Sequence, residues 1–200
     1  MLTKRLKTDE KSYKSSVNEA AAILKNGGIV AIPTETVYGL ATSALDENAV
    51  KKVFAAKGRP QDNPLIVHIA DIKELGRIAA DIPNGAFECA RRFWPGPLTM
   101  VLKRTDKIPA LVSAGLDTVA VRMPSDKTAR DIINASGLPL AAPSANTSGK
   151  PSPTKAKYVL EDLDGKIDAV VMGGDCGVGV ESTVITLVTD PPRLLRPGAV

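Results

Sequence analysis

The sequence predicts an α/β domain built on a mixed β-sheet with helices on its faces. Short apolar runs rich in β-branched residues, typical of buried strands, alternate with segments of helical periodicity along most of the chain. Near residues 97–122 and 183–196, however, predicted strands follow one another, which favours a mixed sheet over a doubly wound one. Neither a repeat nor a linker divides the 200 residues, so we expect one domain over residues 1–200, with a core at about 15–198 and no second domain.

Caps, stops and apolar spacing define the individual elements. A first helix is expected from residue 15 or 16 to residue 26, with a serine cap and a glycine stop. A second helix follows an Asp46 N-cap and ends at Gly58, which supplies a left-handed residue. We expect further helices over residues 71–80, 83–94, 125–137 with Ser125 as its cap, and 155–163, and strands over residues 29–32, 65–69, 97–104, 117–124, 138–143, 169–173, 183–188 and 193–198.

Composition excludes several classes of protein. No apolar run approaches the roughly 18 residues that a membrane helix needs, and the charged N-terminus lacks the apolar stretch of a secretory signal, so we expect a cytoplasmic protein without a membrane partner. Cys89 and Cys176 lie far apart without a CxxC pair, which indicates neither a zinc site nor a disulfide scaffold. The net charge of +4 is compatible with a phosphate-rich ligand or RNA but requires neither.

Four polar loops lie at the ends of predicted strands, at residues 33–36, 57–63, 143–154 and 173–182. In α/β proteins ligand sites gather in such loops, so we expect them to converge. They and the neighbouring strands carry hydroxyls, an amide and cations that suit phosphate and carboxylate oxygens: Thr34, Thr36, Ser144, Asn146, Ser152, Ser182, Lys57, Arg59, Arg122 and Arg196. Taken singly, each of these residues is more often a turn or cap residue than a ligand, and a solvated helix end explains Lys57 and Arg59 equally well.

Standard catalytic signatures are missing from the sequence. The segment SGKPSPT lacks the leading glycine of a phosphate-binding loop, and CGVGVES leads into a strand instead of a helix. His68 is the single histidine, lies in an apolar strand and has no GxSxG partner, so neither a serine hydrolase nor a His/Cys metal site is indicated. Any Mg²⁺ is expected to arrive with a polyphosphate.

Six motifs in fixed order resemble the YrdC-like family of threonylcarbamoyl-AMP synthases: PTETVYGL, KGRP followed by NPLIVHI, FWPGPLTMVL, VAVRMP, APSAN and STV with LLRPG. The resemblance runs from about residue 20 to residue 198. It implies an open, twisted, mixed α/β sheet with a cationic concave face, and an L-threonylcarbamoyladenylate synthase that joins L-threonine, bicarbonate and Mg²⁺-bound ATP and releases pyrophosphate. A tRNA threonylcarbamoyl-transferase complex would then transfer the group to adenosine next to the anticodon of ANN-decoding tRNAs.

The same resemblance implies roles for individual residues. The K-x-R pair becomes Lys57 and Arg59 and the S-x-N pair becomes Ser144 and Asn146, which together are the expected catalytic residues. The residues expected to bind ATP are Arg59, Asn63, Thr118, Ser144, Ser152 and Arg196. The residues expected to hold L-threonine are Thr34, Thr36, His68, Arg122, Ser182 and, through its backbone, Ala142. Arg122 would clamp the carboxylate, and no protein-ligated metal is expected.

Three alternatives remain open at this stage. Many family members continue past LLRPG into a linker and a smaller domain, whereas this sequence stops at Val200, so the chain is either a single-domain version or a catalytic domain cut from a longer protein. A module that binds tRNA or double-stranded RNA without catalysis, or that adds weak RNA binding to catalysis, is a second reading. A carbamoyltransferase-type domain of hydrogenase maturation is a third.

Overall fold

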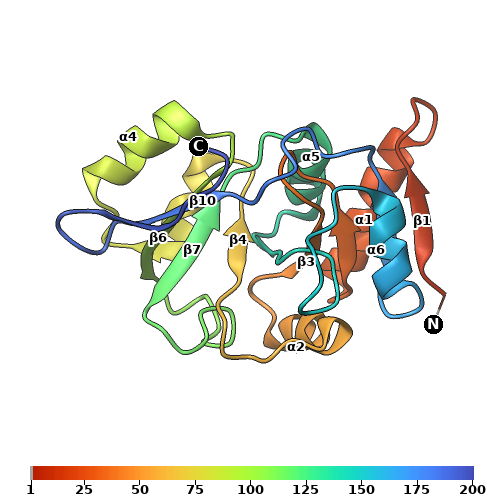
Figure 1. Cartoon of the computed structure of the whole chain (residues 1–200), viewed down its shortest axis with the longest axis horizontal. Helices are drawn as coiled ribbons and strands as arrows, with labels where there is room; N and C mark the ends of the chain where they lie inside the picture. The colour runs from red at the N-terminus through yellow and green to blue at the C-terminus, as the bar shows by residue number, and fades with distance from the viewer. Residues whose placement is uncertain (1) are drawn as a thin grey trace.

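The computed structural model describes residues 2–200, whose strands form one continuous sheet (Figure 1). The strands are β1 (Lys4–Lys7), β2 (Val30–Ile32), β3 (Gly39–Ser43), β4 (Ile66–His68), β5 (Ala79–Ala80), β6 (Leu98–Arg104), β7 (Thr118–Arg122), β8 (Leu140–Ala141), β9 (Ala169–Met172), β10 (Thr183–Thr186) and β11 (Arg193–Arg196). Their order in space is β1-β9-β2-β3-β8-β4-β7-β6-β10-β11, with β5 paired to β6 outside this path.

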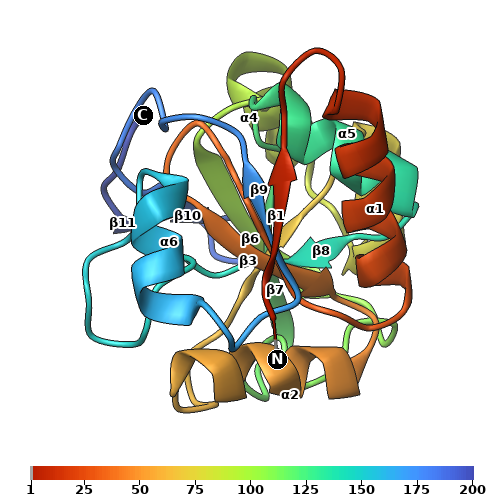
Figure 2. The ribbon, with the colours of Figure 1, turned by 90° about the vertical axis from the view of Figure 1, so that its right-hand side faces the viewer.

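Helices cover both faces of this sheet. They are α1 (Tyr13–Lys25), α2 (Glu47–Lys57), the 3₁₀ turn η1 (Ile72–Glu74), α3 (Leu75–Ile78), α4 (Asn84–Phe93), α5 (Lys127–Ser136) and α6 (Ala156–Leu163). Seen from the β1 edge, α1 and α5 lie on one side of the sheet, α6 lies on the other, and α2 closes the bottom (Figure 2). Among residues 2–200, no helix combines the length and the apolar character needed to cross a bilayer.

The sheet is mixed, as the sequence predicted. β1 runs parallel to β9 and β9 parallel to β2, whereas β6 pairs antiparallel with β7 and parallel with β10. The strand pairs β6 and β7, and β10 and β11, are the consecutive strands that argued against a doubly wound sheet. The prediction of an open mixed sheet with flanking helices is therefore confirmed.

Two helix caps differ in how well the sequence predicted them. The Asp46 carboxylate accepts hydrogen bonds from the backbone N–H groups of Asn48 and Ala49, and Gly58 is left-handed with φ of 59°, both as expected. Ser125, by contrast, is not the cap of α5, because Asp126 accepts from the N–H of Ala129 at 2.8 Å. Ser and Asp are both strong cap formers, so two adjacent candidates leave the choice to the local backbone.

Three further expectations need correction. Helix α1 begins at Tyr13, and Ser16 is a buried helical residue whose hydroxyl donates to the carbonyl of Lys7, so neither predicted serine is its cap. Residues 71–80 form η1, the single turn α3 and strand β5 instead of one helix. The expected strand over residues 138–143 shortens to β8, and β1 was not predicted at all. β1 shows only one buried residue, Leu6, so its sequence carries no clear apolar pattern.

Alternation along the strands gives the central sheet two different faces. Val67, Val119 and Val121 point into a large core that also contains buried side chains of α2, α3 and α4. Their neighbours Ile66, His68, Thr118, Ala120 and Arg122 therefore point to the opposite face, because successive strand residues alternate in direction. Helices do not fill this second face of β4 and β7, and the candidate site lies there.

Candidate functional site

A cavity of about 650 Å³ opens over β4, β7, β6 and β10. Strand pairing sets the floor of this cavity, since residues in register point to the same face. One row contains His68 of β4 opposite Arg122 of β7. The next row contains Ile66, Ala120 and Val101. The site therefore occupies the sheet face itself, and the loops at strand ends, where the sequence led us to expect it, form its walls.

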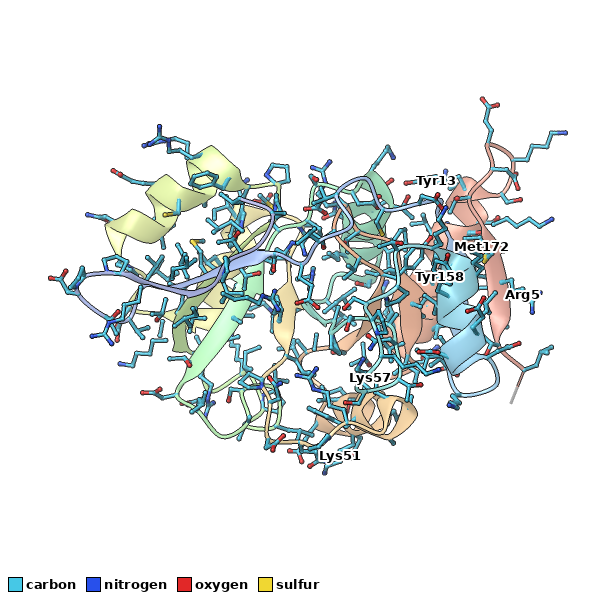
Figure 3. The ribbon with its side chains drawn as sticks, in the orientation of Figure 1. Arg5, Tyr13, Lys51, Lys57, Tyr158 and Met172 are labelled. Atoms are coloured by element: carbon cyan, nitrogen blue, oxygen red, sulfur yellow. The ribbon has the colours of Figure 1, made fainter. Side chains whose placement is uncertain are left out.

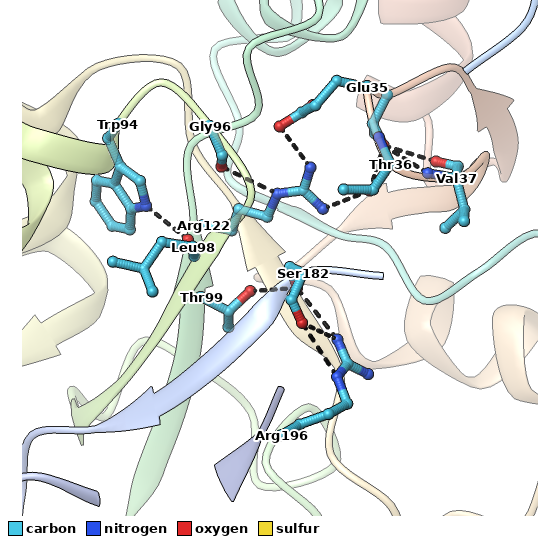
Figure 4. A network of polar contacts seen from close by, with 11 residues as sticks. Glu35, Thr36, Val37, Trp94, Gly96, Leu98, Thr99, Arg122, Ser182 and Arg196 are labelled. Atoms are coloured by element: carbon cyan, nitrogen blue, oxygen red, sulfur yellow. Dashed lines mark hydrogen bonds and ion pairs between the residues drawn. The ribbon is translucent and has the colours of Figure 1, made fainter. Parts of the chain in front are cut away.

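Arg122 is the most buried cation on this floor, with 4% of its side chain exposed. Its Nε donates to the carbonyl of Gly96 at 3.3 Å and one terminal nitrogen donates to Thr36 Oγ1 at 2.8 Å (Figure 4). The other terminal nitrogen lies 2.7 Å from Glu35 Oε1. Gly96 must be glycine here, because a Cβ would lie 2.4 Å from the carbonyl oxygen of Phe93.

Glu35 is the counter-ion of Arg122, and sequence reasoning overlooked it. Its side chain is only 13% exposed. Burial is the largest single influence on the Glu35 carboxyl and raises its pKa, but the charge and close contact of Arg122, together with nearby backbone N–H groups, outweigh burial and hold that pKa below its usual range. Among the described residues, neither Glu35 oxygen has an aligned hydrogen-bond partner, so the 2.7 Å contact acts as a charge pair. The PTET motif is the sequence feature that could have revealed this pair, because an acidic residue between two buried threonines needs a buried cation as its partner.

The threonines of the same motif fix its backbone. Thr34 Oγ1 donates to the carbonyl of Val37 at 2.6 Å and lies 2.9 Å from Thr36 Oγ1. Thr34 lines the cavity, whereas Thr36 is fully buried beneath it and reaches it through Arg122. Thr34 is thus placed for direct contact with a ligand and Thr36 for support of the guanidinium.

His68 lines the cavity beside Arg122 and is buried. Burial, with the neighbouring positive charge of Arg122, lowers the pKa of the imidazole to about 3. The ring is therefore neutral near neutral pH and does not compete with Arg122 for an anion. Its Nδ1 lies 3.3 Å from the carbonyl oxygen of Ile66.

Lys57 and Arg59, which the sequence treated as one cationic pair, have separate environments. Lys57 is 2% exposed, and its ammonium donates to the carbonyls of Ser144 and Asn146, the latter at 2.6 Å. It lies on the inner side of α2, while Lys51 on the same helix points outward (Figure 3). Burial, followed by repulsion from Arg59, lowers the pKa of Lys57 to about 8. Its donors hold the Ser144 loop and do not line the cavity.

Arg59 does line the cavity. One terminal nitrogen makes only long contacts, to the carbonyl of Asn63 at 3.3 Å and to that of Pro64 at 3.4 Å. Within residues 2–200 its buried Nε has no hydrogen-bond partner. A guanidinium with unused donors inside a cavity is a ready site for an anion.

Arg196 and Ser182 form a second polar cluster in the lining (Figure 4). Arg196 donates to the carbonyl of Ser182 through Nε at 3.1 Å and through a terminal nitrogen at 2.8 Å. Ser182 Oγ lies 2.8 Å from Thr99 Oγ1. Glu181 pairs with Arg196 at 2.6 Å and also accepts from Ser152 Oγ at 2.8 Å.

The structure brings most of the predicted residues to one cavity. The lining contains Thr34, Arg59, Asn63, His68, Thr118, Arg122, Ala142, Ser144, Ser182 and Arg196. The other four predicted residues, Lys57, Thr36, Asn146 and Ser152, lie outside the lining and reach it through hydrogen bonds to neighbouring residues. Sequence reasoning missed Glu35, Glu181 and an apolar wall of Val101, Leu116, Val184, Val188 and Leu195. The wall was missed because apolar residues in a predicted strand are equally well explained as part of the hydrophobic core.

The donor set of the cavity does not suit a metal held by the protein alone. In the described part of the chain, no three His, Cys, Asp or Glu side chains gather as metal ligands. One carboxylate, that of Glu181, lines the cavity. A single carboxylate is too few ligands for a metal held by the protein alone, whereas Mg²⁺ bound by a polyphosphate needs only one or two carboxylates from a protein.

Comparison with known proteins agrees with the motifs. The family model described as Telomere recombination, Sua5_yciO_yrdC, matches residues 22–198. A Threonylcarbamoyl-AMP synthase of Pyrococcus abyssi is 55% identical over 94% of this chain, and one of Bacillus subtilis is 54% identical over 96%. Both alignments cover 56% of the relative, so the chain spans about half the length of the curated relatives it matches.

A solved relative gives the same fold. The crystal structure of Pyrococcus abyssi Sua5 complexed with L-threonine matches with a TM-score of 0.94 and 52% identity, over 99% of this chain and 58% of that chain. Sequence identity above half across nearly the whole chain leaves no separate fold to consider. The chain therefore belongs to the Sua5/YciO/YrdC family, as its six ordered motifs predicted.

Proposed function

We propose that this chain binds ATP and L-threonine in the cavity over β4, β7, β6 and β10, and joins them with bicarbonate to give threonylcarbamoyl-AMP and pyrophosphate. The observation that carries the proposal is one cavity in which three arginines, Arg59, Arg122 and Arg196, face hydroxyls and an apolar wall. The names of the similar curated proteins support the reaction, and the relative complexed with L-threonine supports one substrate.

The amino-acid end of the cavity is the row around Arg122. The contacts to Gly96, Thr36 and Glu35 leave further N–H groups of the guanidinium free to bind a carboxylate. Thr34, Ser182 and the backbone of Ala142 lie in the same lining and offer groups for the amine and the hydroxyl. A site that hydrogen-bonds a substrate hydroxyl discriminates strongly against analogues that lack it.

The nucleotide end is the side that contains Arg59, Asn63, Ser144, Thr118 and Arg196. The terminal nitrogens of Arg59 make only two long contacts and so retain donors for phosphate oxygens, and the apolar wall suits the flat faces of a nucleobase. Mg²⁺ that arrives with the polyphosphate would neutralise part of the phosphate charge. Lys57, which the sequence predicts to be catalytic, contributes by fixing the loop that presents Ser144.

The reaction proceeds in two steps without a covalent enzyme intermediate. The amine of threonine first adds to the carbon of bicarbonate, and loss of water gives a carbamate. An oxygen of the carbamate then attacks the α-phosphorus of ATP, and pyrophosphate leaves. The cavity holds both reactants together, and the fixed arginines offset negative charge that develops on the phosphates. We also propose that a tRNA threonylcarbamoyl-transferase complex consumes the product.

The test is pyrophosphate release from ATP with Mg²⁺ and bicarbonate, measured with and without L-threonine, followed by mass spectrometry of the nucleotide. We expect release that requires threonine and a threonylcarbamoyl adenylate as product. Arg59→Ala should lower the rate at least about ten-fold, since preorganised charge is a large part of such catalysis. Arg193→Ala, which removes an exposed arginine outside the lining, is the matched control. Threonine-independent release, or equal loss in both variants, would contradict the proposal.

A further inference from the structure

Glu181 binds two side chains, Ser152 and Arg196, that the proposed function assigns to phosphate binding. One carboxylate oxygen lies 2.6 Å from Arg196 and the other accepts from Ser152 Oγ at 2.8 Å. Ser152 and Arg196 were both predicted from sequence to bind ATP. A carboxylate that bridges these two donors holds them as a phosphate group would, because both anions accept from hydroxyl and guanidinium donors.

Arg196 does not depend on Glu181 for its position. The guanidinium makes two contacts with the carbonyl of Ser182 and a third with Ser182 Oγ at 3.2 Å. These contacts remain when the carboxylate leaves. The pair is also well solvated, with 40% of the Arg196 side chain and 44% of the Glu181 side chain exposed, so water can replace either partner at little cost.

The backbone of Glu181 is fixed, which limits an exchange to its side chain. The N–H of Ala199 donates to the Glu181 carbonyl at 3.1 Å. Gly198 packs so closely on this segment that a Cβ there would lie 2.4 Å from the same carbonyl oxygen. Rotation of the carboxylate out of the cavity therefore frees Ser152 and Arg196 without movement of the loop.

We propose that Glu181 is an internal competitor that sets the affinity of this cavity for phosphate groups. A phosphate can use Ser152 and Arg196 only after Glu181 releases them, and the carboxylate also repels any anion that remains nearby. When pyrophosphate leaves, Glu181 takes back both contacts, which favours product release. This inference rests on the proposed function, because it treats Ser152 and Arg196 as part of the polyphosphate site.

The experiment is calorimetric titration of inorganic pyrophosphate into the wild-type chain, Glu181→Gln and Glu181→Ala, with chelator present and at one fixed ionic strength. Glu181→Gln keeps the shape of the side chain and removes its charge, and Glu181→Ala serves if the amide variant fails to fold. Glu88→Gln changes the net charge equally on the exposed face of α4, outside the lining, and is the matched control.

We expect both Glu181 variants to bind pyrophosphate roughly five-fold more tightly than the wild type, since the competing pair is exposed and modest in strength. Glu88→Gln should bind as the wild type does. If the wild type binds and the Glu181 variants bind equally or more weakly, the inference is wrong while the proposed function stands. If none of the proteins binds pyrophosphate, the anion site itself is absent and both proposals are overturned.

Discussion

Two Glu–Arg pairs place an arginine in the lining of the cavity and behave differently. Glu35 and Arg122 are 13% and 4% exposed, whereas Glu181 and Arg196 are 44% and 40% exposed. Their charge separations are nearly the same, 2.7 and 2.6 Å. Solvation therefore distinguishes them: the buried pair is fixed because neither charge can be left alone, and the exposed pair exchanges because water replaces each partner.

The difference in solvent exposure gives the two arginines different roles. Arg122 is held in one orientation by Glu35, Thr36 and Gly96, which suits recognition of a small, rigid group. Arg196 keeps its backbone contacts but has a replaceable anion, which suits a ligand that must enter and leave. Four predictions break or sharpen this comparison.

The largest effect is expected from Glu35→Ala. This change leaves the buried guanidinium of Arg122 without a counter-ion, so the free energy of unfolding should fall by about 3–5 kcal/mol. Urea unfolding of the wild type and the variant measures this loss. A loss below about 1 kcal/mol would show that water reaches Arg122 and that the two pairs do not differ in kind.

Acid is expected to lower the free energy of unfolding through His68, which lies opposite Arg122 in the sheet. Its folded-state pKa of about 3 lies below the ordinary value of 6.5, so the unfolded chain takes up a proton first as the pH falls. The contribution of neutral His68 is complete above pH 6.5 and is lost towards pH 3, which amounts to about 3 kcal/mol by pH 4.

Because His68 is the single histidine, proton NMR of the imidazole tests this directly. The resonance should not titrate between about pH 5 and 8. The control is His68→Gln, whose stability should fall less steeply with acid than that of the wild type. A midpoint near the ordinary value would place His68 in water and contradict its burial.

A smaller effect on stability is expected to distinguish the two cations of the K-x-R pair, Lys57 and Arg59. Lys57→Met leaves the carbonyls of Ser144 and Asn146 without their buried donor, so stability should fall by about 2 kcal/mol. Arg59→Met breaks only two long contacts and should change stability by less than about 0.5 kcal/mol while it weakens nucleotide binding. Thermal unfolding and ATP titration of both variants measure this, and a reversed pattern would make Lys57 the ligand contact.

The smallest effect is expected from Glu181→Ala. Loss of an exposed ion pair should cost no more than about 1 kcal/mol of stability, and added salt should reduce even that. Urea unfolding at two salt concentrations is the measurement, with Glu35→Ala measured beside it. A salt-independent loss as large as that of Glu35→Ala would mean that Glu181 is a structural partner of Arg196.

Local sequence was enough to predict most elements and the composition of the site. Asp46 and Gly58 bound α2 through interactions within a few residues, and the short apolar runs of β6 and β7 are visible in the chain itself. The helix predicted over residues 71–80 is wrong because the end of this segment pairs with β6 as strand β5. No local pattern reveals a pairing with a strand that lies later in the sequence.

What the sequence by itself determined was the mixed sheet, most of its strands and helices, and most of the polar residues that gather in the cavity. Only the tertiary structure decided which charges are buried and which face a ligand. Lys57 meets Asn146 across 89 positions of sequence, and Arg122 meets Thr36 across 86. Local patterns specify backbone conformation, but the energy of a charge depends on its solvent and its partners, and here folding brings those partners from distant parts of the chain.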